Sequence, residues 1–313
     1  PTMTSRWFDY DGDGFLDLFI GNESTDPKDP DWSELYHNNG DGTFTECARE
    51  SGIQIAQFVK GVACADYDND GYLDLYVGRY LDPRLAIPTT FYARNGEQNQ
   101  LYHNNHDGTF TNVTAKAGVG EVGLCLGTVF GDYNDDGYPD IYVVNDFGRK
   151  TLYKNNGDGT FEDVTVHAGA LAYGAGMSAS MSDYDNDGKP DLLASSYAMS
   201  IEESVRTYLG LPHNSATMKL YRNLGNGAFK DVSEETGLNK VFMPMGANFG
   251  DIDNDGYPDI RFGTGELSYA ALLPNVLLHN QGGKKFTDIT TSSGTGELHK
   301  GHGVAFADID NDG

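Results

Sequence analysis

Short runs in which apolar and polar residues alternate recur along the chain, and each is bounded by Gly, Asn or Asp. The runs LDLYVGRY at 73–80 and PDIYVVND at 139–146 are rich in β-branched and aromatic residues at period two, which predicts β-strands. A small or apolar segment precedes each run, as KGVACAD does at 60–66, and predicts a strand before it. These patterns indicate an all-β protein.

A second pattern follows each pair of predicted strands. Residues 35–53, 101–119 and 152–170 each contain two short apolar runs separated by an Asp-Gly pair. This pair favours a hairpin in which both turn positions adopt positive φ. Each of these stretches, together with the two predicted strands before it, therefore gives four predicted strands.

The whole four-strand pattern repeats. An aspartate-rich loop begins at 9, 66, 132, 183, 251 and 308, which gives about 60 residues per repeat, in the range of the longer propeller repeats. Four-stranded units repeated around an axis form the blades of a β-propeller, and neighbouring blades supply the core that one unit cannot build alone. We therefore expect residues 1–313 to form a single β-propeller domain of five complete repeats and a sixth that stops inside its loop.

The loops have the chemistry of calcium sites. Calcium prefers six to eight oxygen ligands, and carboxylates at alternate positions converge where a glycine lets the backbone turn. In DYDNDGYLD at 66–74 the carboxylates stand at positions one, three, five and nine, and the carbonyl of position seven adds a ligand. An EF-hand would continue to a Glu at position twelve and a helix, whereas the twelfth residues here are apolar and begin a strand. The loops are therefore expected to connect the first and second strands of each repeat.

By these positions the predicted calcium ligands are Asp9, Asp11, Asp13, Phe15 and Asp17; Asp66, Asp68, Asp70, Tyr72 and Asp74; Asp132, Asn134, Asp136, Tyr138 and Asp140; Asp183, Asp185, Asp187, Lys189 and Asp191; Asp251, Asp253, Asp255, Tyr257 and Asp259; and Asp308, Asp310 and Asp312. Asn134 replaces a carboxylate, so the third site should be weaker. About five or six structural Ca²⁺ ions follow from this count. Solvated Asp-Gly turns without metal are the alternative.

The DxDxDGxxD loop between two strands resembles the FG-GAP or VCBS repeat of integrin α-chain propellers and many bacterial secreted proteins. The NNGDGTF half is similar to bacterial members related to the ASPIC/UnbV group. The resemblance covers nearly the whole chain, and such propellers usually close with seven blades. It implies that this chain is a fragment or that a partner completes the ring.

The charge and composition of the chain limit its expected partners and its expected location. The net charge of −26 disfavours nucleic acid and anionic membranes as partners, and almost half of the 47 acidic residues stand in the loops. No apolar run is long enough to span a membrane, and the N-terminus lacks the pattern of a signal peptide. Calcium sites of extracellular modules bind at about 10⁻⁴ to 10⁻³ M, which predicts an extracellular, cell-surface or periplasmic protein.

The three cysteines show no metal or redox spacing. Repeat alignment places Cys47 and Cys64 in apolar positions, so we expect them to pack in the core; a Cys47–Cys64 disulfide is the alternative. Among the histidines, His37, His103 and His279 share one position in the third strand and His106 replaces a turn glycine. None of the eight forms a defensible catalytic or metal spacing.

The segments between the second and third strands vary most. They are residues 21–34, 78–100, 144–151, 195–219 and 263–276, and they should lie on the face opposite the calcium loops, where repeat proteins often bind ligands. The fourth is expected to contain a short helix near 201–209. The second carries the ligand-face candidates Arg79, Tyr80, Arg84, Phe91, Tyr92 and Arg94. Packing of these side chains within their own loop is the alternative, and the sequence does not choose.

The function expected from these patterns is a secreted binding module of the adhesion type, with a protein or glycan ligand and no catalytic residue. An enzyme or lectin that acts on extracellular polysaccharide is the first alternative, and a structural subunit of a surface assembly is the second. An aromatic-lined groove with unpaired carboxylates would favour the enzyme, whereas a flat apolar face would favour protein binding.

Overall fold

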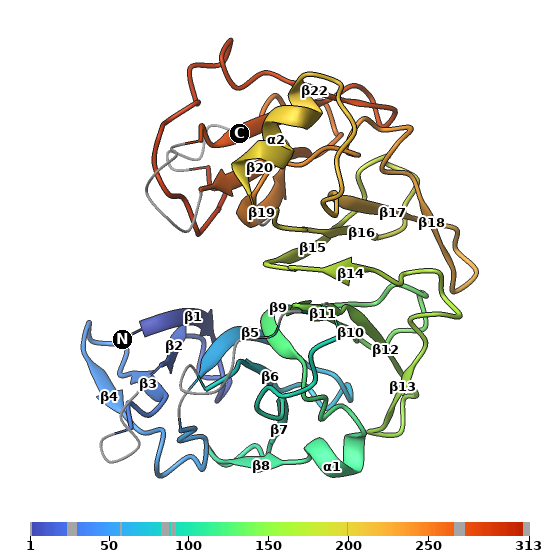
Figure 1. Ribbon diagram of the computed structural model, residues 1–313. Helices are drawn as coiled ribbons and strands as arrows, with labels where there is room; N and C mark the ends of the chain where they lie inside the picture. Colours follow the sequence, from blue (N-terminus) through green and yellow to red (C-terminus); the bar gives the residue numbers. More distant parts are fainter. Residues whose placement is uncertain are drawn as a thin grey trace. The chain divides into compact units, whose positions relative to one another are not determined.

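The computed structural model describes residues 2–23, 30–56, 58–82, 88, 90, 92–198, 200–265 and 273–308 (Figure 1). The predicted ligands Asp310 and Asp312 and the ligand-face candidates Arg84 and Phe91 lie outside the described residues. The chain forms two compact units, residues 1–132 with 136–165 and residues 133–135 with 166–313.

The described residues of the first unit form three four-stranded antiparallel sheets. The first contains β1 (Thr2–Phe8), β2 (Asp17–Asn22), β3 (Glu34–Asn38) and β4 (Phe44–Glu46), and the second contains β5 (Val59–Ala65), β6 (Asp74–Arg79), β7 (Gln100–Asn104) and β8 (Phe110–Asn112). The third contains β9 (Leu124–Gly131), β10 (Asp140–Asp146), β12 (Thr151–Asn155) and β13 (Phe161–Asp163). The short elements α1 (Thr114–Ala117) and β11 (Gly148–Arg149) complete this unit.

The described residues of the second unit form two more sheets of the same kind. One contains β15 (Ala179–Ser182), β16 (Asp191–Ala194), β17 (Lys219–Asn223) and β18 (Phe229–Asp231), and the other contains β19 (Pro244–Gly250), β20 (Asp259–Thr264), β21 (Val276–Asn280) and β22 (Phe286–Asp288). β14 (Tyr173–Gly174) and the helix α2 (Ile201–Tyr208) lie outside these sheets. The prediction of an all-β chain with four strands per repeat is confirmed.

Neighbouring sheets of each unit share their cores. In the first unit, Phe19 of β2 and Leu75 of β6 belong to one cluster of buried side chains, and Tyr76 of β6 and Ile141 of β10 belong to the next. In the second unit, Leu193 of β16 and residues of β20 form a third cluster. The middle sheet of the first unit has a neighbouring sheet on each side, and in its strand β6 every residue except Arg79 is buried.

The cysteines take the predicted packing positions. All three are free thiols; Cys47 and Cys64 pack against the first core cluster, and Cys125 is fully buried. They act as small apolar side chains, as Cys often does in cores.

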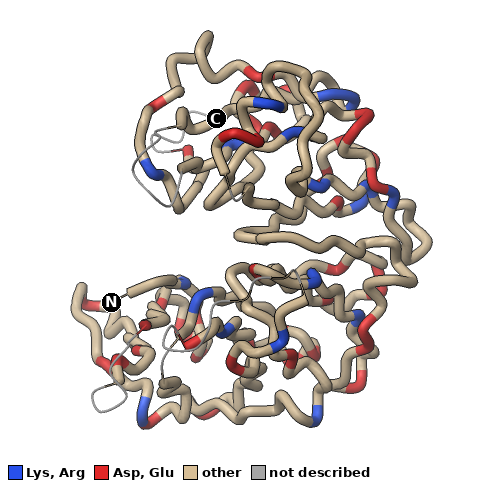
Figure 2. Tube along the Cα trace, in the orientation of Figure 1, with Lys and Arg blue, Asp and Glu red and all other residues tan. Residues whose placement is uncertain are grey.

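The aspartate loops lie where the sequence predicts, between the first and second strands of each sheet. In every sheet the ninth residue of the loop begins the second strand and pairs with the residue before the loop, as Asp17 does with Phe8 and Asp74 with Ala65. Figure 2 shows acidic residues recurring along the trace of each unit. The segments of variable length join the second and third strands, and since the strands are antiparallel they leave each sheet at the opposite end from the loops.

The hairpins between third and fourth strands differ from the prediction. The Asp-Gly pair is not a two-residue turn, because Asn38 pairs with Phe44 and the loop spans 39–43. Its left-handed residues are Gly40 and Gly42 and not Asp41. The Asp41 carboxylate instead accepts hydrogen bonds from the N–H and hydroxyl of Thr43, which turns the chain locally.

Candidate metal centre

The first aspartate of each loop folds the loop around its own carboxylate. Asp66 accepts hydrogen bonds from the backbone N–H groups of Asp70 (3.0 Å) and Gly71 (2.8 Å). The fifth and sixth residues donate the same two bonds to Asp132, Asp183 and Asp251. In the first loop the donors to Asp9 are Gly12 and Gly14. Each of these first carboxylates is thus held in a fixed orientation by the backbone of its own loop.

Two left-handed residues make each loop tight. The glycine at position six has φ of 86° to 95° at Gly14, Gly71, Gly137, Gly188 and Gly256. The fourth residue is also left-handed, at Gly12, Asn69, Asp135, Asn186 and Asn254. Asn, Asp and Gly adopt this conformation more readily than other residues. The glycine could be predicted from the sequence, whereas the second left-handed residue could not.

The carboxylates converge as the calcium hypothesis requires. In the first loop, one carboxylate oxygen from each of Asp9, Asp11 and Asp13 lies within 4.8 Å of the others. The donors are all oxygens, the ligand type that calcium prefers over nitrogen or sulfur. The residues of this loop therefore fit a calcium ion.

The ninth aspartate of each loop has a structural role that the sequence did not reveal. Its side chain is fully buried in all five repeats, at Asp17, Asp74, Asp140, Asp191 and Asp259. The carboxylate of Asp74 accepts hydrogen bonds from the N–H of Tyr67 in the loop (3.1 Å) and of Asn104 at the end of β7 (2.8 Å). This residue therefore joins the loop to the third strand in addition to facing the predicted metal.

Burial of these carboxyl groups has an electrostatic cost in the absence of metal. Desolvation raises the pKa of Asp74 to about 8 and that of Asp191 to about 7, although the backbone N–H groups that they bind favour the ionised form. Desolvation also raises the pKa of Asp17. A divalent cation beside them would favour the ionised form.

These pKa shifts predict how stability depends on pH without calcium. Between about pH 4 and 8 the folded chain holds protons on Asp74 and Asp191 that the unfolded chain has released, so stability falls as pH rises through this window. We expect a lower free energy of unfolding at pH 8 than at pH 5, measured by urea unfolding in calcium-free buffer. Saturating calcium should reduce the difference, and a rise in stability with pH in calcium-free buffer would contradict this assignment.

A basic side chain on the third strand faces each aspartate loop. Nδ1 of His37 lies 3.2 Å from Asp11, and Nδ1 of His279 lies 3.0 Å from Asp259. In the other repeats this position is held by His103, Lys154 and Arg222, which contact Asp68 (3.3 Å), Asp136 (3.5 Å) and Asp185 (3.9 Å). The contacts of His37, His103 and His279 could not be predicted from the sequence, because the carboxylates that they contact lie 20 to 35 residues earlier in the chain.

An asparagine at the end of the third strand joins successive repeats. Nδ2 of Asn104 donates to the carbonyl of Leu73 in its own loop (3.2 Å) and to that of Tyr10 in the preceding loop (2.6 Å). Asn155, Asn223 and Asn280 make the same two kinds of bond. The side chain of Asn104 is almost completely buried, so water cannot replace these bonds.

Replacing Asn104 by Ala should therefore destabilise the first unit. The variant leaves the carbonyls of Leu73 and Tyr10 without this donor, at a cost of about 2–3 kcal/mol. Urea unfolding of the variant and of the wild type measures the loss. Asn105→Ala is a matched control, because its exposed side chain bonds to Thr109 and Thr111 within one hairpin; equal losses in both variants would contradict the argument.

The predicted ligands of the third and sixth sites do not all lie in the described part of one unit. Asn134 of the third loop belongs to the second unit, whereas Asp132, Asp136 and Asp140 belong to the first. Of the sixth site, Asp308 is described and its other two predicted ligands are not.

The ligand-face candidates divide into two groups. Arg79 donates to the carbonyl of Ala56 and lies 3.4 Å from Glu97, and the hydroxyl of Tyr80 donates to Asp146 (2.7 Å). Tyr92 and Arg94 are exposed. The first two therefore serve packing within their own unit, and the last two present their side chains at the surface.

The helix predicted near 201–209 is present as α2, and several apolar side chains on it and directly after it are exposed. Val205, Tyr208, Leu209 and Leu211 are all exposed, with Leu209 67% exposed. Ser204 on the inner side is buried and donates to the carbonyl of Val241. The helix could be predicted from the sequence, whereas the side chains that it exposes to solvent could not. We call Val205, Tyr208, Leu209 and Leu211 the α2 patch.

A family model for FG-GAP-like repeats matches residues 9–77, 89–143, 132–194 and 208–260. The matched stretches cover more than half of the chain, so it belongs to the FG-GAP-like repeat family, as the loops predict. Cartilage acidic protein 1 of Mus musculus and that of Homo sapiens are each 29% identical to it over 266 residues, which is 81% of this chain and 38% of each relative. The chain thus spans little more than a third of the length of these curated relatives.

Solved structures give weaker similarities. An Agrocybe aegerita lectin that recognises non-reducing terminal N-acetylglucosamine matches at 16% identity and a TM-score of 0.38, over 91% of this chain and 78% of the lectin. A Bacillus licheniformis rhamnogalacturonan lyase matches at 16% identity and a TM-score of 0.39, over 94% of this chain and 65% of the lyase.

Among the described residues, no helix is long and apolar enough to cross a membrane.

Proposed function

We propose that this chain is part of a calcium-stabilised β-propeller that acts outside the cell as a protein-binding module. The observation that carries the proposal is the loop geometry: in each of four loops that lie wholly within one unit, backbone N–H groups hold the first carboxylate in place, and a fully buried ninth carboxylate closes the loop. Oxygen-only loops of this kind suit calcium, and affinities typical of extracellular modules require millimolar calcium.

The propeller arrangement rests on the repeat and its shared cores. Each four-stranded sheet contributes to the same cluster as the next sheet in its unit, and an asparagine bonds each repeat to the one before it. Units that pack only on their neighbours form either an open array or a ring, and a twisted four-stranded unit favours the ring. We propose seven blades in the complete ring, on the resemblance to integrin-type propellers.

We propose binding rather than catalysis because the acidic and basic side chains recur at the same positions of successive repeats. A catalytic group would be expected to stand in one repeat and not in the others. The ligand surface that we propose includes the α2 patch, which lies in the longest segment between second and third strands. Exposed Leu, Val and Tyr side chains so close together in the sequence favour a protein ligand over a glycan.

The test is affinity capture from the extracellular material of the source, in 5 mM calcium and after calcium removal. We expect one defined protein to be recovered in calcium, and Leu209→Asp to lose it. Val166→Asp is the matched control, because Val166 is equally exposed in the same unit but outside this segment. Recovery of polysaccharide in place of protein, or equal recovery by both variants, would contradict the proposal.

A further inference from the structure

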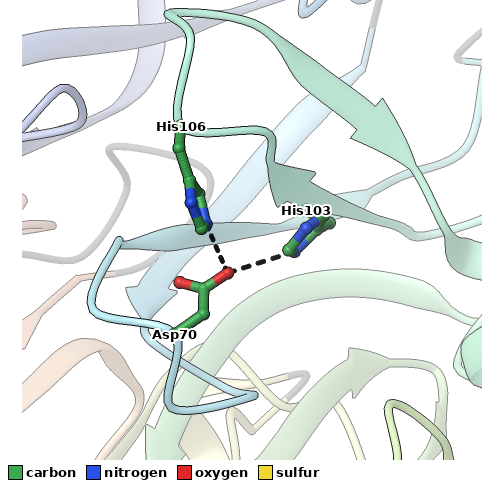
Figure 3. A group of neighbouring side chains, drawn as sticks. All are labelled: Asp70, His103 and His106. Carbon is green, nitrogen blue, oxygen red and sulfur yellow. Dashed lines mark hydrogen bonds and ion pairs between the residues drawn. The ribbon is translucent and has the colours of Figure 1, made fainter.

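The second repeat contains a cluster that none of the other described repeats has. Two histidines approach the carboxylate at position five of its loop: Nε2 of His106 lies 2.6 Å from Oδ2 of Asp70, and Nδ1 of His103 lies 4.0 Å from the same oxygen (Figure 3). His103 comes from β7 and His106 from the hairpin that follows it. One ligand atom from each of the three side chains lies within 4.8 Å of the others.

His106 occupies a backbone position that is unfavourable for a side chain. Its φ is 64°, and in the other four repeats the equivalent residues are Gly40, Gly157, Gly225 and Gly282, with φ of 62° to 72°. His is among the non-glycine residues that tolerate this conformation, but the position still costs conformational free energy. The ring stacks on Tyr72 at 4.2 Å between ring centroids, which directs Nε2 at Asp70.

His103 is held with a nitrogen directed at the loop. Its Nδ1 is buried and makes no hydrogen bond among the described residues, although carboxylate oxygens of Asp68 and Asp74 both lie 3.3 Å away. A buried ring nitrogen without a hydrogen bond is unusual in proteins. A metal ion bound to this nitrogen would satisfy it. Nδ1 of His37 in the first repeat is also buried without a hydrogen bond, so the feature that distinguishes the second repeat is His106.

We propose that His103, His106 and Asp70 bind a divalent transition-metal ion of the zinc class, beside the calcium loop. Imidazole nitrogens suit zinc and are poor ligands for calcium, which takes oxygen. Tetrahedral zinc with bonds of about 2.0–2.1 Å sets its ligand atoms about 3.3 Å apart. The separations of 2.6 and 4.0 Å bracket this value, so small side-chain movements complete the site. A fourth ligand, either water or the adjacent Asp68, would close it.

The alternative is that the histidines only offset the charge of the loop. Lys154 and Arg222 do this in the third and fourth repeats, where each contacts a loop carboxylate from the position of His103. A lysine can replace a histidine in this charge role but is a poor zinc ligand at neutral pH. The two roles therefore predict different results for the same substitution.

The experiment is a calorimetric titration of the whole chain with Zn²⁺, in metal-free buffer and again in 5 mM calcium. The variants His106→Gly and His103→Lys copy residues that other repeats carry at these positions, so both should fold, and thermal unfolding checks this. His37→Lys is the control, because the first repeat has a histidine at the same strand position but Gly40 in its hairpin.

We expect one zinc equivalent in the wild type and in His37→Lys, and an affinity at least about tenfold lower in His106→Gly and in His103→Lys. Unchanged zinc affinity in His106→Gly and His103→Lys, or no saturable zinc binding by the wild type, would overturn the proposal. Asp70 is also a predicted calcium ligand, so calcium bound in this loop should compete with zinc, whereas the metal-free titration reports on zinc even if calcium binds nowhere. Failure of calcium binding is therefore distinguishable from failure of this site.

Discussion

Removing calcium is expected to lower the thermal stability of both units. Without metal, each loop holds three or four carboxyl groups close together, with one of them fully buried. A ligand present at about 100 times its dissociation constant stabilises the folded state by about 2.7 kcal/mol per site. With a dissociation constant of about 10⁻⁴ M, 10 mM calcium reaches that ratio. For units of this size, such a change shifts the melting temperature by about 5–10 °C for each site.

The measurement is thermal unfolding at a series of free calcium concentrations from metal-free buffer to 10 mM. Sodium chloride at matched ionic strength controls for general screening of the net charge of −26. Magnesium is the second control, because its small octahedral shell fits these loops less well than calcium's flexible one. A melting temperature that does not depend on calcium, or that rises equally with sodium chloride, would show that the loops are solvated turns.

The order of strands and the position of the loops could be predicted because both depend on local patterns. Alternation at period two marks the strands, and a glycine at the sixth position with carboxylates at alternate positions marks the loop. The prediction of a two-residue Asp-Gly turn was wrong. The side chain of Asp41 accepts a hydrogen bond from the backbone N–H of Thr43, an interaction that the preference of Asp-Gly pairs for tight turns does not take into account. The core positions of the cysteines followed from aligning the repeats.

The contacts around the loops could not be predicted, because they join residues far apart in the chain. Asp74 bonds to Asn104, 30 residues later, and Asn104 bonds back to Tyr10, 94 residues earlier. The recurrence of Asn and of a basic residue at the same strand position was visible in the sequence. Their partners were not, because pairing the third strand to the second fixes which side chains face the loop. Repetition at equal positions therefore indicated a shared role without revealing the role.

The ninth aspartate of each loop accepts buried hydrogen bonds and is also a proposed metal ligand, so replacing it should strongly lower the free energy of unfolding. Replacing Asp74 by Ala removes the acceptor for the N–H groups of Tyr67 and Asn104, both in the interior, which costs about 2–6 kcal/mol. This loss does not require metal, so we expect Asp74→Ala to lower the free energy of unfolding in metal-free buffer as well as in 10 mM calcium. The loss should be larger in calcium, because a proposed ligand is also removed.

Asp68→Asn is the matched variant, because Asp68 lies in the same loop and, apart from its contact with His103, its proposed role is metal binding. Burial and the neighbouring Asp70 raise the pKa of Asp68, so in metal-free buffer its charge is unfavourable and the amide should be neutral or stabilising. In calcium the same variant loses a charged ligand and should be less stable than the wild type. A change of sign for Asp68→Asn but not for Asp74→Ala would separate metal binding from hydrogen bonding within one loop. If both variants lost stability only in calcium, the ninth carboxylate would be a metal ligand without the structural role that its hydrogen bonds indicate.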